Sequence, residues 1–239
     1  MIEVHLKKLR ARDEISHAEE QEIRSLVSQV VEIPADRTAI RHGEPLSQST
    51  LLLEGWMARA KDLPSGQRQI AEIHVAGDFT DLHGFTLKRL DHDIITISPC
   101  RVALVPHERL KDMTERFPHL SRVYWFMTNM DAAIHREWTL SLGRRSAISR
   151  MAHLFCELNV RLGIVELALN DSYEFPFTQV ELGECLGLTS VHVNRTLQEL
   201  RRLGLVDLQS RRLSILDPDG LKAMADFDPA YLYLEKRSR

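Results

Sequence analysis

Hydrophobic and polar residues follow two distinct patterns along the chain. Between Val30 and Arg109, short apolar runs are separated by turn-forming segments such as His42-Gly-Glu-Pro45 and Pro64-Ser-Gly66. The runs are Val30–Ile33, Ala39–Ile40, Thr50–Leu53, Trp56–Arg59, Gln69–His74, Ile94–Ile97 and Arg101–Val105. Many short strands at near-even spacing are typical of a β-sandwich or a small barrel, and we expect one here.

Helical periods flank this region. A short helix is predicted over residues 14–29, where Ser16 and Glu19 have the spacing of a capping box. A long helix is predicted from Pro118 to Leu142, with proline in its first turn. Along it, apolar residues recur every three or four positions: Leu120, Val123, Met127, Met130, Ile134 and Trp138. The stripe predicts a parallel dimer seam, and the alternative is a helix packed only on its own domain.

The segment that begins at Thr178 meets the requirements of a helix-turn-helix. Thr178 and Glu181 form a second capping box at the start of the first helix. Gly187 suits the left-handed residue that ends that helix, and Thr189 or Ser190 can cap the next one. We therefore expect the second helix to enter the major groove of DNA.

The packing residues and the chain that follows support the same interpretation. Gly183 removes a side chain where the second helix must approach the first. Contacts between the two helices are expected from Val180, Leu182, Leu186, Leu188, Val193 and Leu197. After Gly204, Leu205–Leu208 and Leu213–Leu216 predict a β-hairpin, which is the wing of a winged helix-turn-helix. Its tip carries Arg211 and Arg212, which we expect to meet phosphates, unless they only form a solvated turn.

Composition narrows the class of protein. The chain has 239 residues, 44% hydrophobic and 27% charged, with a formal net charge of −3. Only the stretch from Gly187 to Arg212 is basic, so we expect modest non-specific DNA affinity. Three scattered cysteines argue against a disulfide framework and predict a reducing cytoplasm. No apolar run approaches the roughly 20 residues of a membrane span, and no secretory leader is recognised.

Several motifs together resemble the Crp/Fnr regulators of bacteria over nearly the whole length. The motifs are Arg41-His-Gly-Glu-Pro45, Ala76-Gly-Asp-Phe79, Gly143-Arg-Arg-Ser146 and, most specific, the segment Leu182–Arg195. The resemblance implies an α+β protein with a cyclic-nucleotide-binding-like β jelly-roll sensor. The implied parts are a sensor over residues 1–115, a dimerisation helix over 116–142, a winged helix-turn-helix over 143–217 and a tail over 218–239.

The same resemblance implies function. Such proteins are homodimeric transcription factors that bind an effector in the sensor and a palindromic operator with paired helices, with RNA polymerase as a further partner. The expected DNA-binding residues are Thr178, Thr189, Ser190, Val191, His192, Asn194, Arg195, Arg211 and Arg212. Arg195 keeps the side chain that pairs with guanine, whereas Val191 stands where relatives have a glutamate. The operator should therefore differ from the usual one.

The sensor departs from the cyclic-AMP-binding members. Leu82 stands where they have the glutamate for the ribose, and Leu90-Asp91 stands near the place of their Arg-Ser pair for the phosphate. Leucine offers no hydrogen bond and Asp91 repels a phosphate, so we expect a small-molecule effector other than cyclic AMP. The expected effector contacts are Leu82, His83, Leu90 and Asp91.

Alternatives remain for the sensor. It could be a scaffold without an effector, its pocket filled by side chains such as Leu82, Phe85 and Leu90. A metal or haem sensor, or a cupin-like enzyme, would need clustered ligands. The histidines at 42, 74, 83 and 92 lack such a spacing, and no cysteine precedes Cys100 for an iron–sulfur cluster. We expect no cofactor, no catalytic residues and no enzyme. Cys185 is interpreted as a buried thiol rather than a redox switch.

Overall fold

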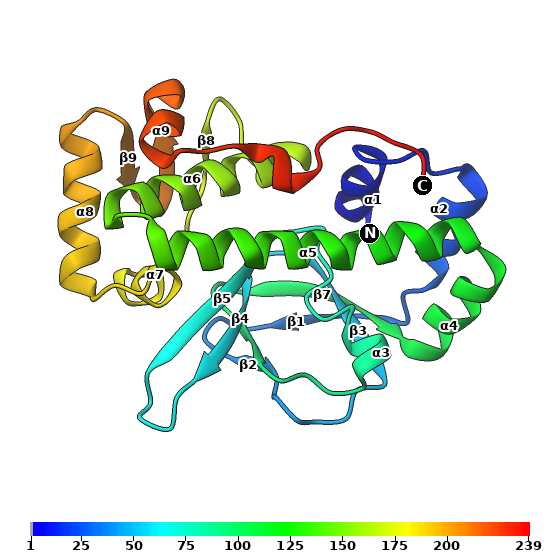
Figure 1. Cartoon of the computed structure of the whole chain (residues 1–239). Coiled ribbons are helices and arrows are strands. Elements are labelled where there is room, and N and C mark those ends of the chain that lie inside the picture. The colour runs from blue at the N-terminus through cyan, green and yellow to red at the C-terminus, as the bar shows by residue number, and fades with distance from the viewer. Residues whose placement is uncertain (1) are drawn as a thin grey trace.

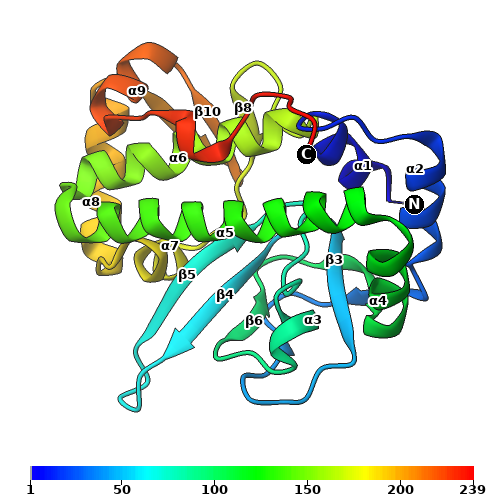
Figure 2. The ribbon, with the colours of Figure 1, turned by 45° about the vertical axis from the view of Figure 1, so that its right-hand side comes forward.

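The computed structural model describes residues 2–239, in which a long helix separates a β-rich half from a helical half (Figure 1). That helix, α5 (Pro118–Arg144), extends across the molecule, with the strands of the first half on one side and α6 (Ala147–Ile164) on the other (Figures 1 and 2). Helix and sheet are therefore mixed in the α+β manner that the sequence predicts, and the strands of the first half precede α5.

The first half contains two antiparallel sheets. One has the order β1-β7-β3, formed by β1 (Gln29–Ile33), β3 (Gln48–Glu54) and β7 (Cys100–Pro106). The other has the order β2-β6-β4-β5, formed by β2 (Thr38–Ile40), β4 (Met57–Asp62), β5 (Arg68–His74) and β6 (Asp93–Thr96). Each of the seven predicted apolar runs overlaps one of these strands. The alternating pattern thus identified the strands correctly.

Short helices surround the sheets. The helix predicted over residues 14–29 is α2 (His17–Ser25), and its capping box of Ser16 and Glu19 is present. Three helices of the first half were not predicted: α1 (Glu3–Arg10), α3 (Gly84–Leu87) and α4 (His107–Arg116). Helix α1 packs against the turn that follows β5, where His5 Nδ1 donates to the Gly77 carbonyl at 2.8 Å and Lys8 pairs with Asp78.

Helix α5 confirms the predicted start at Pro118 but corrects the predicted seam. The six stripe residues are buried within their own chain, none more than 8% exposed. They are Leu120, Val123, Met127, Met130, Ile134 and Trp138. They face the sheets, α1 and α6, because an apolar stripe on a single helix is buried first against the nearest apolar surface of its own fold. These six side chains are therefore not available for contact with a second chain.

The second half contains a three-helix unit with a small sheet. Its helices are α6, α7 (Gln179–Leu186) and α8 (Ser190–Arg202), and its sheet has the order β8-β10-β9. Those strands are β8 (Ser172–Glu174), β9 (Val206–Gln209) and β10 (Arg212–Ile215). The segment expected as a tail from residue 218 begins instead with α9 (Pro218–Ala225), whose Leu221 and Ala225 are buried. A 3₁₀ turn, η1 (Pro229–Leu232), follows.

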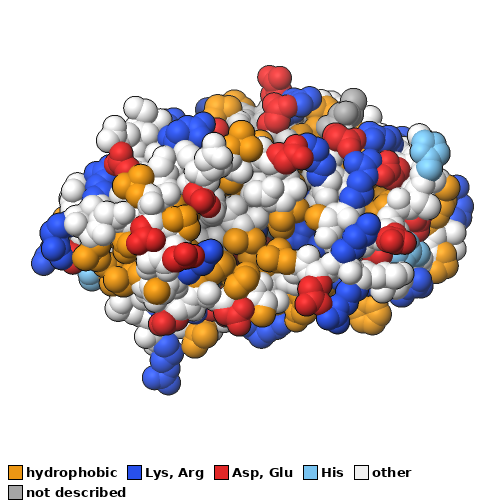
Figure 3. All heavy atoms as spheres, turned by 90° about the horizontal axis from the view of Figure 1, so that it is seen from above, with side chains coloured by type: hydrophobic (Ala, Val, Ile, Leu, Met, Phe, Trp, Pro, Cys, Tyr) orange, Lys and Arg blue, Asp and Glu red, His pale blue; other side chains and the backbone are white. Residues whose placement is uncertain are grey.

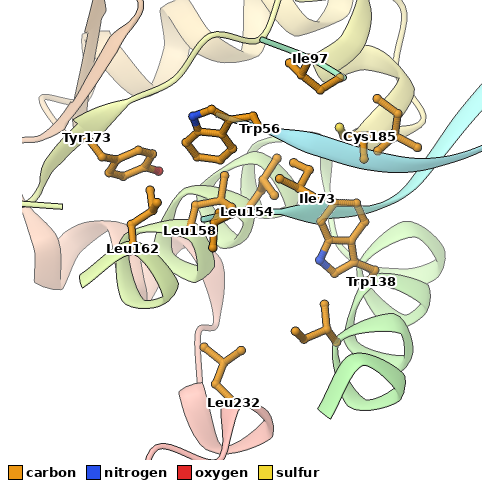
Figure 4. Close-up of a cluster of buried hydrophobic side chains, with 14 of the residues drawn as sticks. Trp56, Ile73, Ile97, Trp138, Leu154, Leu158, Leu162, Tyr173, Cys185 and Leu232 are labelled. Carbon is orange, nitrogen blue, oxygen red and sulfur yellow. The ribbon is translucent and has the colours of Figure 1, made fainter. Parts of the chain in front are cut away.

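One hydrophobic core extends through both halves. Figure 4 shows Trp56 and Ile73 from the sensor beside Leu154 and Leu158 of α6, with Trp138 of α5 alongside. A smaller cluster lies within the two sheets of the first half, here called the β-roll. It consists of Leu52, Met57, Leu90, Ile94, Cys100 and Val102. The two halves therefore share apolar packing rather than meeting only through a linker.

Candidate nucleic-acid interface

The turn between α7 and α8 is built as the sequence predicts. Thr178 and Glu181 close a capping box: the Glu181 carboxylate accepts from the Thr178 N–H at 2.7 Å, and Thr178 Oγ1 accepts from the Glu181 N–H at 3.2 Å. Gly187 ends α7 with a left-handed φ of 62°. Thr189, rather than Ser190, caps α8 by accepting from the His192 N–H at 3.3 Å. These contacts fix the direction in which α8 leaves the turn.

Gly183 sets the distance between the two helices. A Cβ at this position would lie 2.5 Å from the Leu188 carbonyl oxygen, so only glycine permits the approach. Leu182, Leu186, Val193 and Leu197 are buried as predicted. Val180 is not, because it is 60% exposed and lies on the outer side of α7. The prediction that Val180 contacts the second helix is wrong. Val180 lies in the first turn of α7, before the point where α7 packs against α8.

The outward face of α8 carries the predicted base-reading residues. Val191 is 68% exposed, and His192, Asn194 and Arg195 are also exposed. Arg195 forms no hydrogen bond or ion pair within residues 2–239, so its guanidinium is available to a ligand. Gln198 and Arg202, which were not among the predicted residues, are exposed and continue the same face at helical spacing. Their position follows from the period of α8 and could have been found from it.

The wing has a two-residue turn. β9 and β10 pair with Gln209 opposite Arg212, and Ser210 and Arg211 between them have φ values of 49° and 60°. The exposed Arg211 side chain lies at the tip, as predicted. Arg212 is also exposed but lies on the β8 side, where its guanidinium is 3.4 Å from Ser172 Oγ. β8, the third strand of this sheet, was not predicted because it has only three residues.

Charge on the outer surface is mixed rather than strongly positive. In the view from above, Lys and Arg side chains are interspersed with Asp and Glu over the whole face (Figure 3). Arg202 pairs with Glu199 at 2.7 Å, and Arg201 lies 3.5 Å from Asp207. Two of the arginines near the wing are therefore partly neutralised, which leaves Arg195, Arg211 and Arg212 as cations without a carboxylate partner in the described chain.

A cavity of about 460 Å³ lies between the sensor sheet and α5. Its lining includes His83 and Asp91, two of the four predicted effector contacts. The other two do not line it: Leu90 is buried in the β-roll cluster and Leu82 borders a separate small space near α1. In each of the pairs Leu82-His83 and Leu90-Asp91, the two neighbouring side chains face opposite sides, so only one of them reaches the cavity. The residues that the sequence analysis missed are Arg59, Lys61, Ala71, Thr128, Asp131, Ala132 and His135, with His92 considered only as a ligand.

The cavity is polar, but its cationic side chains already form ion pairs with carboxylates of the same chain. Arg59 is buried and donates to Thr80 O, to Glu72 at 2.6 Å and to Asp131 at 2.9 Å. Lys61 pairs with Asp91 at 2.9 Å. Burial and the nearby Arg59 charge lower the pKa of His83 to about 3, so its ring is neutral. Of the cavity's own charges, none remains as a free cation for a phosphate.

Among residues 2–239, no group of three or more His, Cys, Asp or Glu side chains could hold a metal ion. Cys185 is 2% exposed, and burial raises the pKa of its thiol, as expected for a structural cysteine. Within the same residues, the helices include none with the length and apolar character needed to cross a membrane.

Comparison with known proteins agrees with this geometry. Residues 30–117 match the cyclic nucleotide-binding domain, and residues 149–224 match the Crp-like helix-turn-helix domain. The nitrogen fixation regulation protein FixK of Bradyrhizobium diazoefficiens is 30% identical over 175 residues, which covers 73% of this chain and 72% of that protein. A probable transcriptional activator of Rhizobium leguminosarum bv. viciae is 29% identical over 195 residues, 80% and 79% of the two chains.

The fold is also found among solved structures. The structure of FixK2 from Bradyrhizobium japonicum superposes with a TM-score of 0.74 at 24% sequence identity. The match covers 83% of this chain and 98% of that one. At this identity the likeness establishes the arrangement of sensor, long helix and helix-turn-helix.

Proposed function

This chain belongs to the Crp/Fnr family of transcriptional regulators, and we propose that it acts as a homodimer on a palindromic operator. The observation that carries the proposal is the outward face of α8, where the exposed Arg195 has no partner in the described chain. A guanidinium in this position can donate to both major-groove acceptors of guanine. Each half-site is then expected to contain one indispensable G·C pair.

Selection of bound sequences from a random DNA pool tests this proposal. Inverted half-sites are expected about one helical turn apart, roughly 34 Å between centres. Arg195→Ala should cost about 1–3 kcal/mol per half-site and relax the preference at one base pair. Arg211→Ala is the matched control, because a phosphate contact weakens all sequences alike and flattens the salt dependence. Equal loss for every base with Arg195→Ala would make Arg195 another phosphate contact.

The proposed dimer uses the exposed face of α5. Arg122, Trp125, Asn129, Ala132 and Arg136 are exposed at alternating steps of three and four residues. That spacing is typical of a coiled-coil seam, and Trp125, 69% exposed, is unusual for a tryptophan that has no partner. Ala132→Glu should give a monomer in sedimentation. Glu115→Lys on α4 changes charge at an exposed site away from this face and should leave the dimer intact.

The proposed effector is a small molecule other than cyclic AMP that binds the cavity beside His83. The open space of about 460 Å³ beside His83 leaves room for a small ligand. Asp91 and Asp131 line it, and both neighbouring cations are already paired. A cyclic phosphate would therefore meet carboxylates without a free cation. Calorimetry with cyclic AMP should therefore show no micromolar binding.

RNA polymerase is the proposed protein partner at the promoter.

A further inference from the structure

Residues 227–239, here named the clasp, run back from the DNA-binding half to the sensor. From α9 the clasp passes over α6 and α5, and its end lies beside α1 and α2 (Figures 1 and 2). It is packed rather than loosely laid on the surface, because Leu232 in η1 is 0% exposed and joins the shared core (Figure 4). The clasp thus provides a second connection between the halves, besides the hinge at Arg145-Ser146.

The first half of the clasp holds the DNA-binding side. The Tyr231 hydroxyl donates to Glu157 of α6 at 2.8 Å, and Glu157 is fully buried. The Tyr231 ring stacks on His153 with ring centroids 5.9 Å apart, and Phe227 meets the same ring edge-on at 5.2 Å. Trp138 Nε1 of α5 donates to the same Glu157 oxygen at 3.0 Å. One carboxylate therefore joins α5, α6 and the clasp.

The second half of the clasp holds the sensor side. The buried Arg12 side chain lies 3.4 Å from the Leu232 carbonyl, and the Arg237 N–H donates to the Arg12 carbonyl at 3.0 Å. Arg239 donates to the same carbonyl at 2.7 Å and lies 3.4 Å from Asp13. Its guanidinium also lies 3.5 Å from the centre of the Phe126 ring on α5. The clasp therefore contacts the residues that follow α1 as well as α5.

A buried chain of charges beneath the clasp continues the connection. Glu157 pairs with Arg161 at 2.9 Å, and Arg161 reaches Asp78 in the sensor at 2.9 Å. Arg161 also donates to the Ile73 carbonyl at 2.7 Å, and Asp78 pairs with Lys8 of α1. Such a network tolerates little displacement, because a buried charge that loses its partner destabilises the fold. The position of α6 on the sensor is accordingly fixed by directional contacts.

We propose that the clasp fixes the DNA-binding half on the sensor and so sets the position of α8 for two half-sites at once. It does not cover the reading face, since Val191 and Arg195 remain exposed with the clasp in place. Its role is therefore to orient α8 before binding, which lowers the ordering cost when both half-sites of a dimer are engaged. The proposal rests on the proposed function, because it presumes a dimer on a palindrome.

The test compares the full chain with a variant that ends after Asp226. The variant should lose on the order of tenfold affinity for the palindrome, because two loosened helices must then be ordered on binding. Its affinity for a single half-site should be nearly unchanged. Hydrogen exchange should become faster at the hinge, residues 144–150, while sedimentation still shows a dimer. Glu235→Gln is the matched control, because it changes an exposed clasp side chain outside these contacts.

Each other outcome has a defined meaning. Unchanged palindrome affinity with unchanged hinge exchange overturns the proposal, and so does tighter binding, which would make the clasp inhibitory. Equal losses on palindrome and half-site would also overturn it, as general damage to the fold. If the shortened chain does not fold, the double variant Tyr231→Phe with Arg239→Ala decides by the same measurements. If the full chain binds no DNA, the proposed function fails and hinge exchange alone decides the clasp.

Discussion

The helix-turn-helix and the junction between sensor and α6 are held together in opposite ways. In the former, the contacts that fix the geometry join residues close in sequence, such as Thr178 with Glu181 and Gly183 with Leu188. In the latter, Arg161 reaches Asp78 across 83 residues of chain, and both side chains are buried. The comparison shows that the reading surface depends on local geometry, whereas its placement depends on distant, charged contacts.

The largest effect is expected at the junction. Arg161→Met removes one partner from Glu157 and Asp78 while keeping an apolar side chain of similar length. Leaving buried carboxylates without their cation should lower the free energy of unfolding by about 3–5 kcal/mol. Denaturant unfolding measures it. Arg202→Met is the control, since the exposed Arg202–Glu199 pair is screened by water and should contribute little to stability. Similar losses in both variants would remove the contrast between the regions.

A smaller effect is expected where the two helices cross. Gly183→Ala places a Cβ 2.5 Å from the Leu188 carbonyl oxygen, so α7 and α8 must move apart. The expected destabilisation is about 1–3 kcal/mol, with weaker operator binding because α8 changes its angle. Gly163→Ala in α6 is the matched control, as nothing lies within 4 Å of its Cβ. The melting temperature and DNA affinity should fall for Gly183→Ala but not for Gly163→Ala. A Gly183→Ala protein with unchanged stability and affinity would contradict the close contact between α7 and α8.

The junction should also respond to acid through His153. Burial, with the nearby Arg145 charge, lowers the pKa of His153 from 6.5 to about 3. Its contribution to stability is therefore present above pH 6.5 and is lost as pH falls toward the folded-state value. At about pH 5.5 the loss is about 1.4 kcal/mol. Melting curves of His153→Asn should show a shallower acid slope than the wild type.

The smallest effect is expected at the start of α7. Thr178→Ala removes the hydroxyl that accepts from the Glu181 N–H. Loss of such a cap costs about 1 kcal/mol. Thr178→Ser keeps the hydroxyl and should restore most of the difference in thermal unfolding. If serine did not rescue the variant, packing of the threonine methyl group would be the cause instead.

The contrast also explains which parts of the structure could be predicted. The strands, the long helix and the caps at Thr178 and Gly187 follow from period and turn chemistry, which act within a few residues. Whether the stripe of α5 is buried within its own chain or against a second chain could not be decided from the sequence, because an apolar stripe shows that burial occurs but not against what. The cavity residues Arg59 and His135 lie far apart in sequence and are joined only by the fold. Leu90 and Asp91 were expected to act together, but they face opposite sides: Leu90 lies in the buried cluster and Asp91 lines the cavity.

The shared hydrophobic core has a consequence for modular exchange between proteins. A chimera that joined this sensor to another helix-turn-helix would leave Trp56 and Ile73 facing water or an unmatched surface. Each isolated half should then aggregate through its exposed apolar surface. The intact chain should unfold in one thermal transition instead of two. Evolution of new operator specificity in such a protein is therefore expected to proceed by point changes on α8 while the whole domain stays in place.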